Sequence, residues 1–204
     1  MLRILIFVFV AYCYIQITLE RKFAMKNLIF KLLITICLVA LVGNSAFAGT
    51  KPKVIVLDFQ LNDLTDLPNA PEELARIAYL TATYKHQLAV MGVEVLPANE
   101  KLESYLATQS ATYLFDNVEH AAMLAAGSGA DYLLIGVALK PTYLFVYPRI
   151  LLIDIKTKNV LMAKASQLES SWSDKNTTAR AAEKLAKFVS DALNKIQAKN
   201  TISK

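Results

Sequence analysis

Three aspartates lie at the end of an apolar segment at residues 53–59 or shortly after it. They are the first side chains along the chain whose spacing could support chemistry. Asp58, Asp63 and Asp66 stand at the end of that segment, and open α/β sheets commonly bind ligands beyond the carboxyl ends of their strands. The spacing does not match a calcium loop, which requires acids at alternate positions and a glycine at the turn. We therefore expect Asp63 and Asp66 to cap turns, and Asp58 is the candidate for ligand binding.

The two histidines do not predict a metal site. His86 lies on the side of its predicted helix opposite the apolar face, so we expect it to be solvated. His120 belongs to the first turn of another predicted helix, and no carboxylate spacing links the two histidines as zinc would require. The sequence therefore indicates no catalytic residue, no metal and no cofactor. An enzyme is the alternative, and it would need Asp58, Asp131 and His120 to converge in three dimensions.

An aromatic segment near the middle of the chain is the most suggestive surface. Tyr143, Phe145 and Tyr147 alternate in sequence, so in a strand they would share one face. A proline follows them, which is typical of an edge strand or a bulge. With the nearby cation of Arg149, such an edge could pair with a partner's strand or hold an apolar ligand; the alternative is that the rings pack under a helix. Trp172, the only tryptophan, either caps the core beneath the last helix or anchors a partner.

A secretory signal starts at an internal methionine. Met25 is followed by two lysines, an apolar run at residues 32–42 and the small-x-small sequence that ends at Ala48. This order of basic start, apolar centre and small residues is typical of a signal peptide. It predicts cleavage between Ala48 and Gly49 and a periplasmic mature protein.

The residues before Met25 have three possible interpretations. They could form a membrane helix, belong to one long signal, or result from a start codon placed too early. The apolar run at residues 2–18 is slightly short for a span, which needs about 20 residues, and a self-sufficient signal makes it redundant. We interpret residues 1–24 as an extension from an early start and residues 25–48 as the signal peptide. The alternative is a membrane-tethered accessory protein that retains residues 1–48.

Removal of this leader changes the bulk chemistry of the protein. The leader holds five of the 22 basic side chains and one of the 17 acidic ones, so the mature part carries 17 and 16. No basic excess remains that would predict nucleic-acid binding. Both cysteines, Cys13 and Cys37, leave with the leader, so the mature chain can form no disulfide. Small residues do not precede Cys37, so we expect no lipid anchor and no stable membrane insertion after cleavage.

Hydrophobic periodicity predicts one domain over residues 49–204, of the α/β (α+β) class, with a single mixed sheet and helices packed on it. The predicted order is β-α-β-α-α-β-β-β-α. A hairpin turn is expected at residues 156–159, where Asn159 could adopt a left-handed conformation. The strands are expected at residues 53–59, 93–96, 131–139, 142–155 and 160–168, and the helices at 71–91, 100–107, 118–126 and from about 174 to 196.

Several of these segments together resemble a known family. They are Val54–Asp58 with Phe59, the sequence GADYLLIG at residues 129–136, Ile153-Asp154 in the hairpin, and Ser171-Trp172 before the last helix. The chain resembles the DUF2380/DUF3280 family of uncharacterised secreted bacterial proteins and, more distantly, the amino-terminal domain of TolB. The first resemblance implies a periplasmic protein, sometimes encoded beside quinoprotein alcohol-oxidation systems. The second implies binding to other envelope proteins, and neither carries over a catalytic residue.

Together these observations predict a periplasmic, non-catalytic accessory or binding protein. Its expected partner is an envelope protein or a small ligand. Asp58, the aromatic segment with Arg149, and Trp172 are its candidate binding residues.

Overall fold

The structure of the protein is a computed structural model that describes residues 51–66, 68, 70–168 and 174–202. All of them belong to one compact unit, Thr50–Lys204. The predicted signal peptide, its cleavage site, both cysteines and Trp172 lie outside the described residues.

The described residues form a mixed α/β fold with one sheet of six strands and five helices. This confirms the predicted fold class. Two elements were not predicted, β2 and the short helix α5, so the strand order was predicted only in part. In chain order, the elements are β1 (Lys53–Val56), β2 (Gln60–Asp63), α3 (Pro71–Val90), β3 (Glu94–Leu96), α4 (Glu100–Thr108), α5 (Tyr113–Asp116), α6 (Val118–Ala125), β4 (Tyr132–Lys140), β5 (Tyr147–Asp154), β6 (Val160–Ala165) and α7 (Lys175–Ile202).

The sheet combines parallel and antiparallel pairs. Its strand order is β3-β1-β4-β5-β6, and β2 pairs with β4 beyond the end of β1. The pairs β1–β3, β1–β4 and β2–β4 are parallel, whereas β4–β5 and β5–β6 are antiparallel hairpins. The strand expected at residues 53–59 therefore ends at Val56. After a break at residues 57–59, β2 adds a second short strand to the same side of β4.

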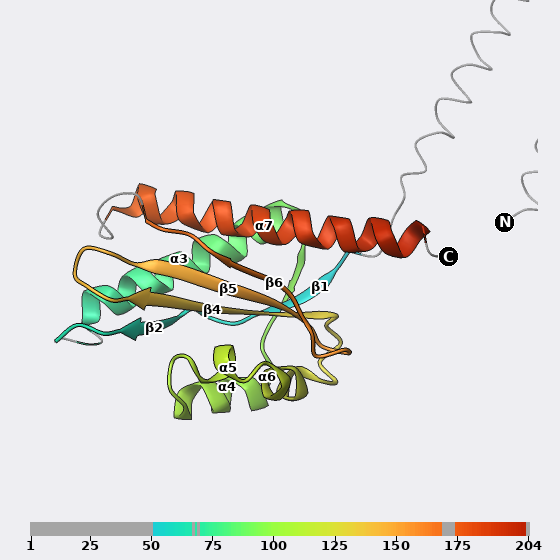
Figure 1. The fold of residues 1–204 in the computed structure, drawn as a ribbon, viewed down its shortest axis with the longest axis horizontal. Helices are drawn as coiled ribbons and strands as arrows, with labels where there is room; N and C mark the ends of the chain where they lie inside the picture. The colour runs from blue at the N-terminus through green and yellow to red at the C-terminus, as the bar shows by residue number, and fades with distance from the viewer. Residues whose placement is uncertain (1–50, 67, 69, 169–173, 203–204) are drawn as a thin grey trace, which may run out of the picture. The chain divides into compact units, whose positions relative to one another are not determined.

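Helices cover both faces of the sheet. The long helices α3 and α7 lie together on one face, and α4, α5 and α6 form a smaller layer on the other (Figure 1). Side chains that alternate along the strands divide between two cores, because successive residues of a strand point to opposite faces. In β4, Leu134 packs toward α3 and α7, whereas Leu133 and Ile135 pack toward the smaller layer.

The centre of the larger core depends on a glycine in β4. Gly136 lies directly against the ring of Phe59, and a Cβ atom at this position would lie 2.6 Å from Phe59 Cε1. The Phe59 ring in turn meets Tyr84 of α3 edge to face, with the ring centroids 5.4 Å apart. The absence of a side chain at Gly136 thus lets the break between β1 and β2 pack close to the sheet.

The predicted aromatic edge strand is wrong in two respects. First, β5 begins only at Tyr147, so Tyr143 and Phe145 lie in the connection at residues 141–146. Pro141 has no backbone N–H to continue the ladder, which is consistent with the end of β4 at Lys140. Second, β5 is an interior strand between β4 and β6.

The turn between β5 and β6 also differs in one detail from the prediction. Lys158, not Asn159, has the positive φ, at 59°. Its N–H donates to the carbonyl of Asp154, and the Asp154 carboxylate accepts from Thr157 N–H at 2.7 Å. These bonds close the turn and place Lys158 in the left-handed conformation.

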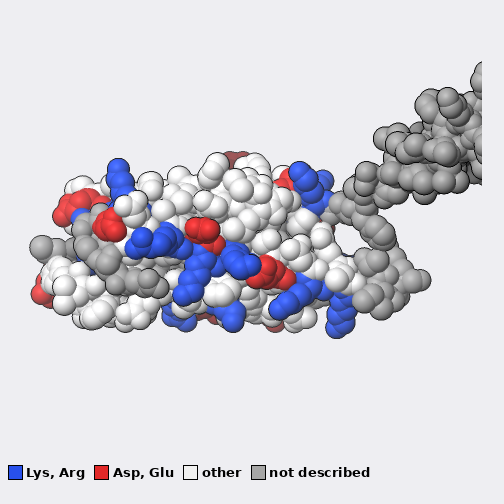
Figure 2. All heavy atoms as spheres, turned by 90° about the horizontal axis from the view of Figure 1, so that it is seen from above, with Lys and Arg blue, Asp and Glu red and all other residues white. Residues whose placement is uncertain are grey.

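The outer face of α7 is rich in basic side chains. Its charged residues are Lys175, Arg180, Glu183, Lys184, Lys187, Asp191, Lys195 and Lys199. Acidic side chains are interspersed among the more numerous basic ones (Figure 2), and Lys187 pairs with Asp191 one turn away at 3.4 Å. Interspersed charges of this kind suit a solvated helix surface.

Candidate functional site

The connection between β4 and β5 exposes three large apolar side chains in a row. We call residues 141–146 the aromatic loop. Tyr143 is 57% exposed, Leu144 76% and Phe145 43%. The next residue, Val146, is buried in the larger core, and its carbonyl accepts a hydrogen bond from Leu168 N–H. The loop therefore presents an apolar tip whose end is anchored.

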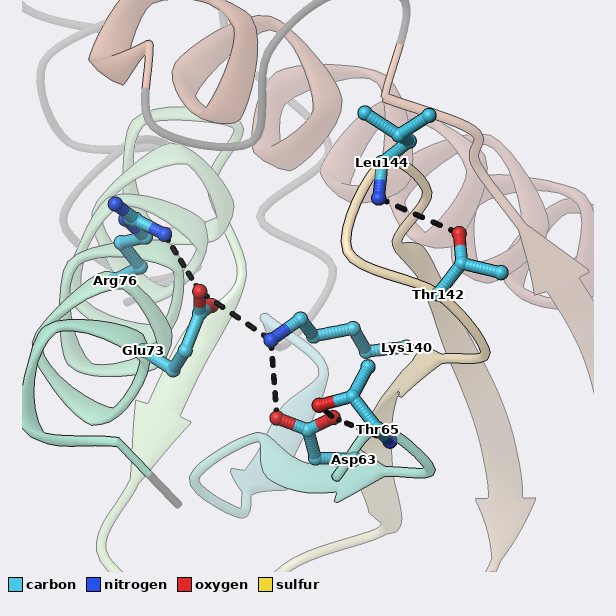
Figure 3. A network of polar contacts seen from close by, with 7 residues as sticks. All are labelled: Asp63, Thr65, Glu73, Arg76, Lys140, Thr142 and Leu144. Carbon is cyan, nitrogen blue, oxygen red and sulfur yellow. Dashed lines mark hydrogen bonds and ion pairs between the residues drawn. The ribbon is translucent and has the colours of Figure 1, made fainter. Parts of the chain in front are cut away.

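A buried network of charged side chains lies directly beneath the start of this loop (Figure 3). Lys140, the last residue of β4, places its Nζ 3.0 Å from Asp63 Oδ2 and 3.3 Å from Glu73 Oε1. Arg76 donates to the same Glu73 oxygen at 2.7 Å. The side chains of Lys140 and Asp63 are only 3% and 1% exposed. The network therefore ties β2, β4 and the first turn of α3 together at the end of the sheet that carries the aromatic loop.

The contacts in this network favour the charged forms of Asp63 and Lys140. Burial alone would raise the pKa of Asp63, but hydrogen bonds from Thr65 and Lys140 outweigh it and hold the pKa below the usual value. For Lys140, burial alone would lower the pKa, but the carboxylates of Asp63 and Glu73 outweigh it and raise the pKa. Lys140 and the carboxylates around it thus form a buried ion cluster. Removing one charged partner from such a cluster strongly lowers the free energy of unfolding.

The predicted binding residues of the aromatic segment divide between two positions. The Tyr143 ring lies over Lys140, with Nζ 5.4 Å from the ring centroid. Phe145 stacks on Tyr147, with centroids 6.4 Å apart. Arg149 lies two residues further along β5 with its guanidinium 4.9 Å from the centroid of Phe115 in α5. The structure therefore joins Phe145 to Tyr147, and it directs Arg149 toward the small helical layer.

Asp58 is not part of this site. It lies in the break between β1 and β2, is 67% exposed at its side chain, and accepts a hydrogen bond from Lys85 Nζ of α3 at 2.6 Å. The turn role expected for Asp63 is confirmed, because its Oδ1 accepts from both N–H and Oγ1 of Thr65. The second role of Asp63, as partner of Lys140, was not predicted.

Sequence reasoning missed Lys140, Glu73 and Arg76. A charged residue at the end of the long apolar strand β4 was the available signal, since lysine is almost never fully buried without a partner. The partners could not be identified, because Asp63 is 77 positions away in the sequence.

The residues of the alternative enzyme are not brought together. Asp131 accepts from Lys53 N–H at the start of β1, whereas Asp58 follows the end of that strand. His120 lies among Tyr105 and Tyr113, 3.3 Å from the hydroxyl of Tyr113. Within the described ranges, no three His, Cys, Asp or Glu side chains are grouped so that they could hold a metal ion. Among the helices that the structure describes, none has both the length and the apolarity needed to cross a membrane.

The fold and the site define a mixed α/β domain with an exposed aromatic loop. The chain belongs to the DUF3280 family, described as a protein of unknown function (DUF2380), whose model matches residues 52–187. The family expected from the sequence is therefore confirmed. No curated protein matches the sequence.

Several solved structures are similar to this chain at a low level. PelC, a dodecamer from Paraburkholderia phytofirmans, has 17% identity and a TM-score of 0.42 over 66% of this chain and 84% of that chain. The LpoB C-terminal domain from Escherichia coli has 15% identity and a TM-score of 0.41 over 64% and 94%. TolB from Acinetobacter baumannii has 15% identity and a TM-score of 0.38 over 71% of this chain and 27% of that chain. At these scores and identities the likeness carries no argument about this chain.

Proposed function

We propose that the mature chain is a non-catalytic accessory protein of the bacterial envelope that binds a protein partner through the aromatic loop. The observation that carries this proposal is the exposed tip formed by Tyr143, Leu144 and Phe145. Large apolar side chains gathered on a surface mark interaction sites more often than scattered ones do.

The foundation of the loop suits it to binding. Val146 is buried in the core and Lys140 is fixed in the ion network, so both ends of the loop are held. A loop that is already ordered loses less conformational entropy when a partner binds. Aromatic side chains at the centre of an interface often supply most of its binding energy.

The proposed location is the periplasm, by export through the signal peptide at residues 25–48. Intact mass of the protein recovered from native cells checks this proposal. A chain that begins at Gly49 supports cleavage after Ala48, and a chain that retains residues 1–48 supports the membrane-tethered alternative. The connection to quinoprotein oxidation comes only from the family resemblance and gains no support from the contacts described above.

Site-specific photocrosslinking tests the binding surface. A photoreactive residue at Leu144 should crosslink one recurrent envelope protein in native cells. The matched control is Val90, which is also an exposed apolar residue, 67% exposed, at the opposite end of α3 from the ion network. Tyr143→Ser with Phe145→Ser should abolish the crosslink from Leu144. Equal crosslinking from Leu144 and Val90, or a pattern unchanged by the double substitution, would contradict the proposal.

A further inference from the structure

The free edge of β2 borders a cleft that lies apart from the aromatic loop. β2 pairs with β4 on one side, and no other strand of the described residues pairs with it. The cleft, of about 500 Å³, has residues 58–61 as one wall and Leu74, Ala78 and Thr81 of α3 as another. Gln109 and Ala111, from the connection between α4 and α5, close the third side.

The backbone of this edge is directed into the cleft at alternate residues. Leu64 N–H donates to the carbonyl of Lys140, so the even-numbered residues of β2 use their backbone groups toward β4. Successive residues of a strand direct these groups to opposite sides, so the N–H and C=O groups of Leu61 and Asp63 point away from β4. Phe59, in the break before β2, donates its N–H to Thr81 Oγ1 at 3.0 Å, and both residues line the cleft. The Phe59 N–H is therefore already satisfied by a hydroxyl of α3.

The cleft also lies at an edge position of the sheet that β3 fills only in part. β3 pairs only with Lys53, Ile55 and the residue between them, and Pro97 then follows Leu96. Proline has no N–H with which to extend the ladder. Past this point, the next position in the sheet, beside residues 58–61, holds the cleft and no strand of the described residues.

We propose that this cleft binds an extended peptide segment of a partner protein, which adds to the sheet as a strand beside β2. Strand addition of this kind takes its affinity from main-chain hydrogen bonds and its specificity from alternate side chains. One alternate side chain of the peptide would meet the apolar Leu74 and Ala78. The opposite one would meet Gln109 and Ala111.

The charge of the cleft specifies one further feature of the peptide. Of the described residues that line the cleft, only Asp58 is charged, and Lys85 Nζ donates to its Oδ1 at 2.6 Å. A basic side chain of the peptide complements this exposed carboxylate. The preferred segment is therefore extended, carries a lysine or arginine at the Asp58 end and an apolar residue at the Leu74 end.

A phage-displayed library of random linear heptapeptides, selected on the mature chain, provides the probe. We expect enriched sequences that combine a basic and an apolar residue. Ala78→Arg places a bulky side chain in the cleft and should weaken binding of the best synthetic peptide about tenfold or more. The matched control is Ala75→Arg, an exposed alanine in the same helix outside the cleft lining, which should leave the affinity unchanged.

N-methylated versions of the selected peptide test the main-chain pairing without any change to the protein. Methylation at alternate amides in one register should weaken binding about tenfold or more, because it removes the donors that face β2. Methylation in the other register should have little effect. In hydrogen exchange, the amides of Leu61 and Asp63 should become protected when the peptide binds.

Three outcomes of the peptide experiments would overturn the proposal. They are a library that yields no enriched peptide, equal loss of affinity for both methylation registers, and peptide binding that Ala78→Arg leaves intact. Self-association of the mature chain that Ala78→Arg abolishes would assign the cleft to a second copy, and it would overturn the peptide assignment as well. Because the photocrosslinking test uses Leu144, failure of either proposal leaves the other one testable.

Discussion

At the scale of single residues, two buried polar groups show how differently burial can be compensated. Lys140 is buried with two carboxylates as partners. The hydroxyl of Tyr84 is fully buried and has no hydrogen-bond partner among the described residues. Burial raises the pKa of that hydroxyl far above its usual value, so it is always neutral. A satisfied buried group supports the fold, whereas an unsatisfied one opposes it.

Removal of the Tyr84 hydroxyl should therefore stabilise the protein. Tyr84→Phe keeps the ring that meets Phe59 and is expected to raise the free energy of unfolding by about 1 kcal/mol. Urea denaturation of the mature chain measures the change. Tyr79→Phe, at a partly exposed tyrosine of the same helix, should leave stability unchanged. A lower stability of Tyr84→Phe would show that the hydroxyl has a partner that supports the fold.

Removal of the Lys140 charge should have the opposite effect. Lys140→Met retains most of the apolar stem but leaves the Asp63 carboxylate buried without its cation, which we expect to cost about 3 to 5 kcal/mol of unfolding free energy. Lys85→Met removes the exposed pair with Asp58 and should cost no more than about 1 kcal/mol. Equal effects of the two substitutions in urea denaturation would contradict the assignment of Lys140 to a buried network.

At the scale of elements, the break that joins β1 to β2 packs closely against β4, and this packing helps to determine where β2 lies in the sheet. Phe59 occupies the space over Gly136 and contacts Tyr84 of α3. The same break directs the Phe59 N–H to Thr81 and leaves the edge of β2 facing the cleft. One glycine in β4 therefore helps to position an edge strand in another part of the chain.

A side chain at Gly136 should disturb this arrangement. Gly136→Ala places a Cβ atom against the Phe59 ring, and overpacking of this kind is expected to cost about 1 to 3 kcal/mol of unfolding free energy. Phe59→Leu removes part of the ring, so the two substitutions together should cost less than the sum of their separate effects. A double-mutant cycle measures this coupling. Strict additivity would show that the cost at Gly136 arises elsewhere.

At the scale of the whole molecule, the ion network makes stability depend on pH at both extremes. The pKa of Asp63 is lower in the folded protein than its usual value of 3.8. Its contribution is therefore present above that value and is lost as the pH falls through the lower folded pKa. The pKa of Lys140 is higher than its usual 10.5, so its contribution is present below 10.5 and is lost as the pH rises through the higher folded pKa.

We expect this pH dependence to reside partly in Asp63. The unfolding free energy of the mature chain, measured in urea, should fall between pH 7 and pH 3. Asp63→Asn should be less stable at pH 7 and should lose less on acidification, because the titrating carboxylate is gone. Asp66→Asn, at an exposed aspartate three residues after Asp63, is the control. A loss on acidification that is identical in Asp63→Asn and the unsubstituted chain would contradict this expectation.

The sequence by itself determined the family, the fold class and most of the elements. A helix from about residue 174 to 196 was predicted because apolar residues such as Leu185, Val189 and Leu193 recur at helical spacing. In the structure all three are buried, and α7 spans Lys175–Ile202. Strand β4 was predicted because a long apolar run that is buried on both faces needs no alternation. The spacing of apolar residues and the length of an apolar run are properties of a single segment, so they can be detected without knowledge of the tertiary contacts.

Only the tertiary structure decided the site. Alternating aromatic residues are compatible with both a strand and a loop, and Tyr143 and Phe145 lie in a loop because β4 ends at Lys140, before Pro141. The charge network joins Lys140 to Asp63, 77 positions away, and the cleft forms where β3 ends before its neighbour does. Contacts between residues distant in the chain depend on strand register and helix placement, which hydrophobic periodicity along one segment does not encode.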